Sequence, residues 1–217
     1  MVIAIDGPSG SGKTTTAKMV SKELGYYYCD SGSLYRAVTY FLLDRKVDLN
    51  DDAQIKSEIE NITLEYDLRS NRIFINSHDV TSELRTVRVT ESVSLVSSKK
   101  DVRDRLIDIQ RNLASESDIV LDGRDIGTTV FPNADYKFFL SAEIDVRAQR
   151  RYNELSEDQK SKISYSDICL MIQERDEVDC NRKHSPLVKA RDAVSIDTTH
   201  LSLDEQVKKL VNFIKTN

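Results

Sequence analysis

The sequence predicts an α/β fold in which a parallel sheet is flanked by helices, and three observations lead to this prediction. Short apolar segments alternate with segments of helical periodicity along most of the chain, which is the order typical of parallel sheets. A glycine-rich loop separates the first apolar segment from the first helix. The alternation is interrupted at about residues 60–85 by a pattern typical of antiparallel β-structure. We therefore expect one α/β domain over residues 1–217, with one small β-rich insertion.

The first four predicted elements follow a strand–helix–strand–helix order. Residues 2–6 form a short apolar run, which indicates a buried strand. Apolar residues recur at helical spacing over 14–24, and Gly25 provides the stop. A second strand is predicted at 26–29 and a second helix at 34–43. Three tyrosines lie in the second strand, and we expect them in the core rather than stacked on a base.

The interruption predicts a hairpin and the alternating order then resumes. Its strands are expected at 62–66 and 72–75, joined by a turn at 69–71, with a third short strand near 79–80. The remaining elements are predicted as helices at 87–97, 99–115, 143–157, 164–180 and 203–214, and as strands at 118–121, 136–140 and 194–196. A capping box of Ser202 and Glu205 supports the start of the closing helix.

The composition bounds the possible partners. Of 217 residues, 39% are hydrophobic and 31% are charged, with a net charge of -5. Nucleic-acid-binding proteins usually carry a basic face, so we expect no nucleic-acid partner. No apolar run suits a membrane span, and the three cysteines have no spacing typical of disulfides or zinc. We therefore expect a cytoplasmic monomer that acts on small molecules.

The glycine-rich loop matches the phosphate-binding pattern G-x-x-x-x-G-K-[ST] at each fixed position. It reads Gly7-Pro8-Ser9-Gly10-Ser11-Gly12-Lys13-Thr14. Glycines let successive N–H groups point inward as an anion nest, and the following helix adds its N-terminal dipole. Lys13 is expected to reach the β- and γ-phosphates, and the Thr14 hydroxyl to ligate Mg²⁺. The loop therefore predicts a bound nucleoside triphosphate.

Three further motifs contain arginine and indicate what the triphosphate is used for. They are Asp30–Arg36, Asp122–Gly127 and Glu174–Arg182. The chain has no N-K-x-D motif for guanine, and no H-R-D or D-F-G motif of protein kinases. A phosphate acceptor is already a nucleophile and requires charge neutralisation, which arginine forks supply. Asp125 would also suit the base of a hydroxyl kinase, so that alternative stays open.

These motifs together closely resemble the bacterial-type cytidylate kinases, which are P-loop nucleoside monophosphate kinases. The resemblance extends from Ile3 through the closing helix. It is carried by the segments Ile5–Lys13, Asp30–Arg36, Leu84–Thr86 and Leu121–Thr128, and by Arg175, Asp176, Asp179 and Arg182. The family implies transfer of a phosphoryl group from ATP to CMP or dCMP with Mg²⁺. It also implies a P-loop NTPase core of five parallel strands, a CMP-binding lobe at about 60–85 and a short helical lid at about 150–165.

The resemblance also assigns roles to individual residues. The catalytic residues would be Lys13, Arg124, Asp125 and Arg182. ATP would contact Gly7, Pro8, Ser9, Gly10, Ser11, Gly12, Lys13, Thr14, Thr15 and Arg150. CMP would contact Ser31, Arg36, Ser94, Arg103, Arg124, Asp125, Arg175, Asp179 and Arg182. Thr14 and Asp122 would hold Mg²⁺, partly through water.

The chemistry of cytosine agrees with this assignment. Cytosine presents an N4 amino donor beside acceptors at N3 and O2, so an Asp would accept from N4 while an Arg or Ser donates to the others. For three sets of residues, an alternative interpretation without a role in binding stays open. Asp122 alternatively stabilises a turn, Arg147, Arg150 and Arg151 form a solvated helix face, and Ser94 and Arg103 are ordinary surface residues. Two other functions also remain open, namely a P-loop kinase for another metabolite and a slowly hydrolysing regulatory protein.

Overall fold

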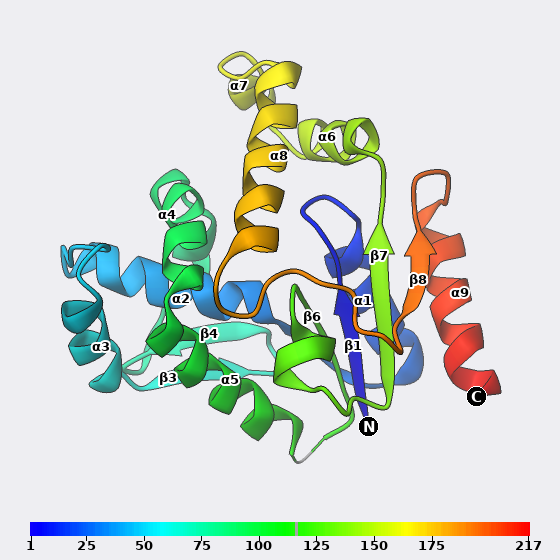
Figure 1. The fold of residues 1–217 in the computed structure, drawn as a ribbon, viewed down its shortest axis with the longest axis horizontal. Coiled ribbons are helices and arrows are strands. Elements are labelled where there is room, and N and C mark those ends of the chain that lie inside the picture. Colours follow the sequence, from blue (N-terminus) through cyan, green and yellow to red (C-terminus); the bar gives the residue numbers. More distant parts are fainter. Residues whose placement is uncertain (116) are drawn as a thin grey trace.

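The main sheet has five parallel strands, as predicted. The computed structural model describes residues 1–115 and 117–217. The strand order is β2-β6-β1-β7-β8 (Figure 1). The strands are β1 (Val2–Asp6), β2 (Tyr27–Asp30), β6 (Ile119–Gly123), β7 (Tyr136–Ser141) and β8 (Val194–Asp197).

The register of the sheet brings the carboxyl ends of its central strands together. Asp6 at the end of β1 pairs with Gly123 of β6, and Asp30 at the end of β2 pairs with Asp122. In open parallel sheets, ligands bind outside these carboxyl ends. The glycine-rich loop after β1 and the segment after β6 therefore leave the sheet as neighbours.

The two faces of the sheet bury different helices because side chains alternate along a strand. Ile3 and Ile5 of β1 pack in a cluster with α1 (Lys13–Leu24) and α9 (Leu203–Thr216). Ala4 lies in the opposite cluster with α2 (Ser31–Asp44). Both faces are covered, as the continuous apolar strands predict.

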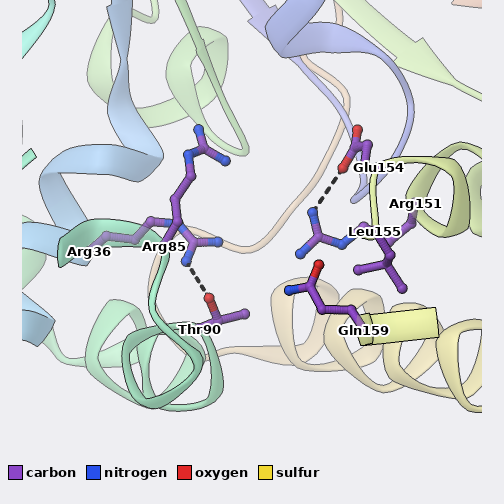
Figure 2. Close-up of a pocket in the computed structure, with 7 residues that line it drawn as sticks. All are labelled: Arg36, Arg85, Thr90, Arg151, Glu154, Leu155 and Gln159. Carbon is purple, nitrogen blue, oxygen red and sulfur yellow. Dashed lines mark hydrogen bonds and ion pairs between the residues drawn. The ribbon is translucent and has the colours of Figure 1, made fainter. Parts of the chain in front are cut away.

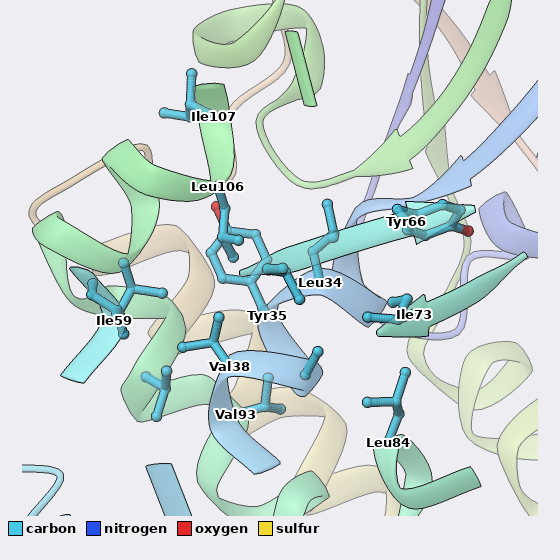
Figure 3. Packing of buried hydrophobic residues seen from close by; sticks show 14 of the residues in the cluster. Leu34, Tyr35, Val38, Ile59, Tyr66, Ile73, Leu84, Val93, Leu106 and Ile107 are labelled. Carbon is cyan, nitrogen blue, oxygen red and sulfur yellow. The ribbon is translucent and has the colours of Figure 1, made fainter. Parts of the chain in front are cut away.

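The predicted insertion is a separate three-stranded antiparallel sheet of β3 (Leu64–Asp67), β4 (Arg72–Ile75) and β5 (His78–Asp79). Figure 3 shows Tyr66 and Ile73 of this sheet on the side of Leu34 of α2, and these residues share one buried apolar cluster with Val38 of the same helix. The insertion therefore shares the core of the main domain. The helix α3 (Asp52–Glu60), which precedes it, was not predicted. Its N-cap Asp51 accepts from the Gln54 N–H at 3.0 Å.

The other helices largely match the prediction. They are α4 (Val87–Ser98), α5 (Lys100–Ala114), α6 (Ile144–Asn153), α7 (Glu157–Lys160) and α8 (Tyr165–Asn181), with a 3₁₀ turn η1 (Thr81–Arg85) and a π-helical turn η2 (Ile126–Val130). The helix predicted at 143–157 ends at Asn153, and Ser156 caps the separate α7. Figure 1 shows α6, α7 and α8 beyond the tips of the strands. In the described part of the chain, no helix has the length and apolar character to cross a membrane.

Candidate active site

A cavity of about 800 Å³ lies at the carboxyl ends of β1, β2 and β6. It is lined by the glycine-rich loop on one side, and by residues of α2, α4, α5 and α8 on the other. Nine basic and five acidic side chains are among the lining residues, although the chain as a whole carries a net charge of -5. The cavity therefore concentrates positive charge, which suits a polyanionic ligand.

The glycine-rich loop has the conformation that its sequence predicts. Gly10 and Gly12 have φ of 75° and 86°, a left-handed conformation that favours glycine. Lys13 begins α1, and its Nζ donates to the Pro8 carbonyl at 3.1 Å. Burial and the nearby Arg124 lower the pKa of Lys13 to about 7, against a partial opposing effect of Asp122. An anionic ligand would favour the charged lysine.

A buried ion pair occupies the opposite side of the cavity. Arg103 of α5 and Asp125, which follows β6, form an ion pair between side chains that are 2% and 5% exposed. Arg103 also donates to the Ser97 carbonyl at 2.9 Å, and Arg182 Nη2 lies 3.6 Å from Asp125 Oδ1. A buried carboxylate beside fixed guanidinium donors offers both an acceptor and donors to a planar polar ligand.

A second group of ion pairs joins α8 to the segment after β6. Asp179 accepts from Arg124 Nε at 2.8 Å and from Arg182 Nη1 at 3.4 Å. Burial opposes ionisation of Asp179, but Arg124, Arg175 and Arg182 outweigh it and lower its pKa. Burial and Arg124 lower the pKa of Arg175 to about 10. Within the described residues, Arg175 Nε and Arg182 Nη2 are buried without a hydrogen-bond partner.

Comparison with known proteins assigns the family. The family model described as "Cytidylate kinase" matches residues 3–216. The chain belongs to the cytidylate kinase family. Among curated relatives, the cytidylate kinase of Ligilactobacillus salivarius is 45% identical over 98% of this chain and 96% of its own length. That of Halalkalibacterium halodurans is 45% identical over 99% of this chain and 97% of its own.

Solved structures support the fold alone. A gluconokinase from Sinorhizobium meliloti aligns with a TM-score of 0.51 at 15% identity, covering 99% of this chain and 91% of the other. A shikimate kinase from Bacteroides thetaiotaomicron aligns with a TM-score of 0.50 at 12% identity, covering 99% and 98%. These likenesses agree with the P-loop kinase fold predicted for the cytidylate kinase family.

The two residues that the family resemblance assigns to Mg²⁺ lie in contact. Thr14 donates to Asp122 Oδ2 at 2.7 Å, and the buried Tyr28 hydroxyl donates to Oδ1 at 2.6 Å. Burial chiefly raises the pKa of Asp122, and the adjacent Asp30 adds to this while Lys13 opposes it. Among the residues described, no cluster of three or more His, Cys, Asp or Glu side chains could hold a metal. Mg²⁺ commonly needs only one or two carboxylates when phosphates supply other ligands, so Thr14 and Asp122 fit this ion.

Arg147 and Arg150 of α6 are not on the solvated face that one interpretation of the sequence proposed, whereas Arg151 is. Arg147 is buried and donates to the Ser9 carbonyl at 3.0 Å. Arg150 donates to the Gly10 carbonyl at 3.4 Å and lines the cavity. Both observations are compatible with a contact to ATP, which stays a prediction. Arg151 is exposed and pairs with Glu154 at 2.9 Å.

A smaller pocket, six of whose seven lining residues also line the cavity, lies between Arg36 and Arg85 on one side and Arg151 on the other. Figure 2 shows Arg36, Arg85 and Thr90 opposite Arg151 and Glu154. Arg36 Nη1 donates to Thr90 Oγ1 at 3.1 Å. Burial, followed by repulsion from Arg85, lowers the pKa of Arg36 to about 10. The family resemblance assigns Arg36 to the acceptor, and its place in the lining of both the smaller pocket and the cavity is compatible with that assignment.

Two residues assigned to CMP have other surroundings in this structure. Ser31 lines the cavity, but its hydroxyl donates to the Asp122 carbonyl at 2.7 Å. Ser94 is not among the described residues that line the cavity, whereas Val93 and Ser97 of the same helix are. The contact of Ser94 with cytosine therefore stays a prediction.

Sequence reasoning gave no separate role to Asp6. Its carboxylate accepts from the Ile126 N–H at 2.9 Å and from the Gly127 N–H at 2.8 Å. It thereby fixes the backbone that directly follows Asp125. Burial raises the pKa of Asp6 to about 6, despite these two hydrogen bonds. A charged residue at the end of an otherwise apolar strand was the available signal.

Proposed function

We propose that this protein transfers the γ-phosphoryl group of ATP to CMP or dCMP, giving ADP and CDP or dCDP. The observation that carries the proposal is that one cavity joins the phosphate-binding loop to the buried Arg103–Asp125 pair. The curated relatives are named cytidylate kinase over nearly their full length. The proposal extends to a cytoplasmic monomer with nucleotide substrates and no nucleic-acid partner.

The base of the acceptor is recognised by complementary hydrogen bonds. Asp125 accepts from the cytosine N4 amino group, and Arg103 donates to the ring acceptors. Uracil carries an acceptor at position 4 and a donor at position 3, so it would leave both buried groups mispaired. Leaving buried polar groups unpaired is the strongest way for a site to reject an analogue. Ser94 is assigned to the same base as part of the proposal.

The acceptor phosphate is brought to the donor by arginines. It needs no general base, since it is already anionic, but two polyanions have to meet in line. Arg124, Arg175 and Arg182 supply the positive charge, while Lys13 holds the donor phosphates. Asp179 keeps two of these arginines in place and is also assigned to the sugar. Arg36 and Ser31 contact the acceptor near its phosphate and sugar.

Mg²⁺ is assigned to Thr14 and Asp122, and when bound it neutralises charge on the donor phosphates. The β-rich lobe at 60–85 is assigned to the CMP side and the segment 150–165 to a lid. Leu155 and Ile163 support the lid assignment because they line the cavity that the two substrates would share.

The decisive measurement is ADP release with CMP, dCMP, UMP, AMP and GMP as acceptors. We expect turnover with CMP or dCMP to exceed that with the other three nucleotides. Equal turnover across the panel, or ATP consumption that no acceptor stimulates, would refute the proposal.

The assignment of Asp125 has its own test. Asp125→Asn replaces a carboxylate oxygen with an amide, which presents a donor to N4, and should lower kcat/KM for CMP by about 10²-fold or more while the Kd for ATP stays within about twofold. Asp104→Asn is the matched control, since Asp104 lies in α5 beside Arg103 but is exposed. If Asp125→Asn phosphorylates CMP at the normal rate, Asp125 does not read the base.

A further inference from the structure

Three consecutive carbonyls of the phosphate-binding loop are held from outside the loop. The Ser9 carbonyl accepts from Arg147 Nη1 at 3.0 Å, and the Gly10 carbonyl from Arg150 Nη1 at 3.4 Å. The Ser11 carbonyl accepts from the Thr198 hydroxyl at 3.0 Å. The two arginines come from α6, and Thr198 directly follows β8.

These contacts bear on the direction of the loop N–H groups. A trans peptide is planar, so the C=O of one residue and the N–H of the next point in opposite directions. A carbonyl that is fixed outward therefore fixes the next N–H inward. By this geometry, Arg147 orients the N–H of Gly10, and Thr198 orients the N–H of Gly12. Inward N–H groups are the donors of an anion nest.

Thr198 lies at the centre of these contacts to the loop, because it binds both Ser11 and Arg150. The residue is wholly buried, and its N–H donates to the Ser141 carbonyl of β7 at 2.8 Å. Arg150 donates to its hydroxyl at 3.0 Å and to its carbonyl at 2.7 Å. The hydroxyl has one proton to donate, and its oxygen lies 3.0 Å from both Ser11 O and Ser141 O. Since Ser141 O already accepts the Thr198 N–H, donation to Ser11 O satisfies both carbonyls.

We propose that Thr198 is a positioning residue for the donor nucleotide: its hydroxyl fixes the Ser11 peptide, so that the Gly12 N–H faces the phosphates, and it holds Arg150 against the loop. This inference rests on the proposed function only in taking ATP as the donor. It gives a defined part in donor binding to a residue that lies 184 positions beyond Thr14, outside the sequence motif.

The test separates the hydroxyl from the bulk of the side chain. Thr198→Val is nearly isosteric and should raise both the Kd for Mg-ATP and the KM for ATP by about 3–10-fold, the loss expected for one net hydrogen bond. The KM for CMP should not change. Thr198→Ser keeps the hydroxyl and should bind ATP within about twofold of the wild type.

Thr199→Val is the matched control. Its hydroxyl donates to Asp197 at 2.6 Å and accepts from the Glu143 N–H at 3.1 Å, and within the described residues it has no hydrogen bond to the loop. It should leave ATP affinity unchanged. Unchanged ATP affinity in Thr198→Val would overturn the inference, as would equal losses in Thr198→Ser and Thr198→Val. ATP binding is titrated directly, without CMP, so a wild type that binds ATP but does not phosphorylate CMP would refute the proposed function alone.

Discussion

The two sides of the cavity, to which the proposed function assigns the phosphoryl donor and the acceptor, are built in different ways. The donor side is a contiguous loop, whose backbone carbonyls are held by hydrogen bonds from α6 and from Thr198. The acceptor side is assembled from separate elements, and its charged side chains pair with one another. Arg103 pairs with Asp125, and Asp179 binds two further arginines.

This difference implies that the donor side is preformed, whereas arginines of the acceptor side would have to exchange a carboxylate partner for a phosphate when the acceptor binds. By the inference above, the N–H groups of Gly10 and Gly12 face the proposed donor site before the nucleotide arrives, so little reorganisation would be needed there. On the acceptor side, Arg124 and Arg182 already have a carboxylate partner in Asp179. An incoming phosphate would have to share those arginines with it. Donor binding should therefore depend on backbone geometry, and acceptor binding on the balance of buried charge.

The largest expected effect is on the acceptor side. Arg103→Met keeps most of the side-chain volume but leaves Arg182 as the one ion-pair partner of Asp125 among the residues that the structure describes. Removing one partner of a buried ion pair costs about 3–5 kcal/mol, so the free energy of unfolding in urea should fall by that amount. Lys100→Met is the control on the same helix, because Lys100 is exposed and its loss should leave stability nearly unchanged. A loss in Arg103→Met no greater than in the control would show that the pair does not stabilise this side.

The next effect concerns the donor side. Under the proposed function, Lys13→Met removes the positive charge assigned to the transferred phosphoryl group and should lower kcat by about 10²–10³-fold, as expected for a group that stabilises transition-state charge. Lys22→Met changes an exposed lysine near the end of the same helix and should leave kcat unaltered. The free energy of unfolding of Lys13→Met should not fall, because burial disfavours the charged lysine in the free protein. A kcat near the wild-type value would remove Lys13 from the catalytic residues.

A smaller effect, which depends on pH, is expected from Asp6, whose carboxylate at the end of β1 holds the backbone that follows Asp125. Its folded pKa of about 6 lies above the ordinary value of 3.8. Asp6 therefore stabilises the fold most below pH 3.8, and this contribution is lost as the pH rises through 6. Relative to Asp6→Asn, the wild type should lose about 3 kcal/mol of unfolding free energy between these limits. A difference that stays flat with pH, measured by urea unfolding at each pH, would contradict the raised pKa.

The sequence predicted the elements that have local signals. Three features depend on residues that are close together in the sequence, namely the apolar run 2–6, the loop with its fixed glycines and the capping box at Ser202. The structure contains all three. The helix α3 was missed because its nine residues contain only two buried positions, Ile55 and Ile59. Two buried positions are too few to establish a helical period.

The site was predictable where a motif exists and not where contacts are tertiary. Lys13, Asp122 and Asp125 lie in recognisable segments, and the structure brings them to one cavity. Thr198 has no sequence signal, because its role depends on the pairing of β8 with β7 and on the approach of Ser11. The buried state of Arg147 could not be anticipated either, since its helix is otherwise strongly charged.

The pairing of Asp6 with Gly123 has a consequence for changing what this enzyme phosphorylates. Because β1 and β6 are hydrogen-bonded neighbours, their ends are about 4.8 Å apart, set by the backbone rather than by side chains. The offset between the donor loop and the acceptor segment is thus built into the scaffold. If Arg103 and Asp125 read the base as proposed, redesign for another base can be confined to the side chains around this ion pair, with the transfer geometry inherited unchanged from the sheet.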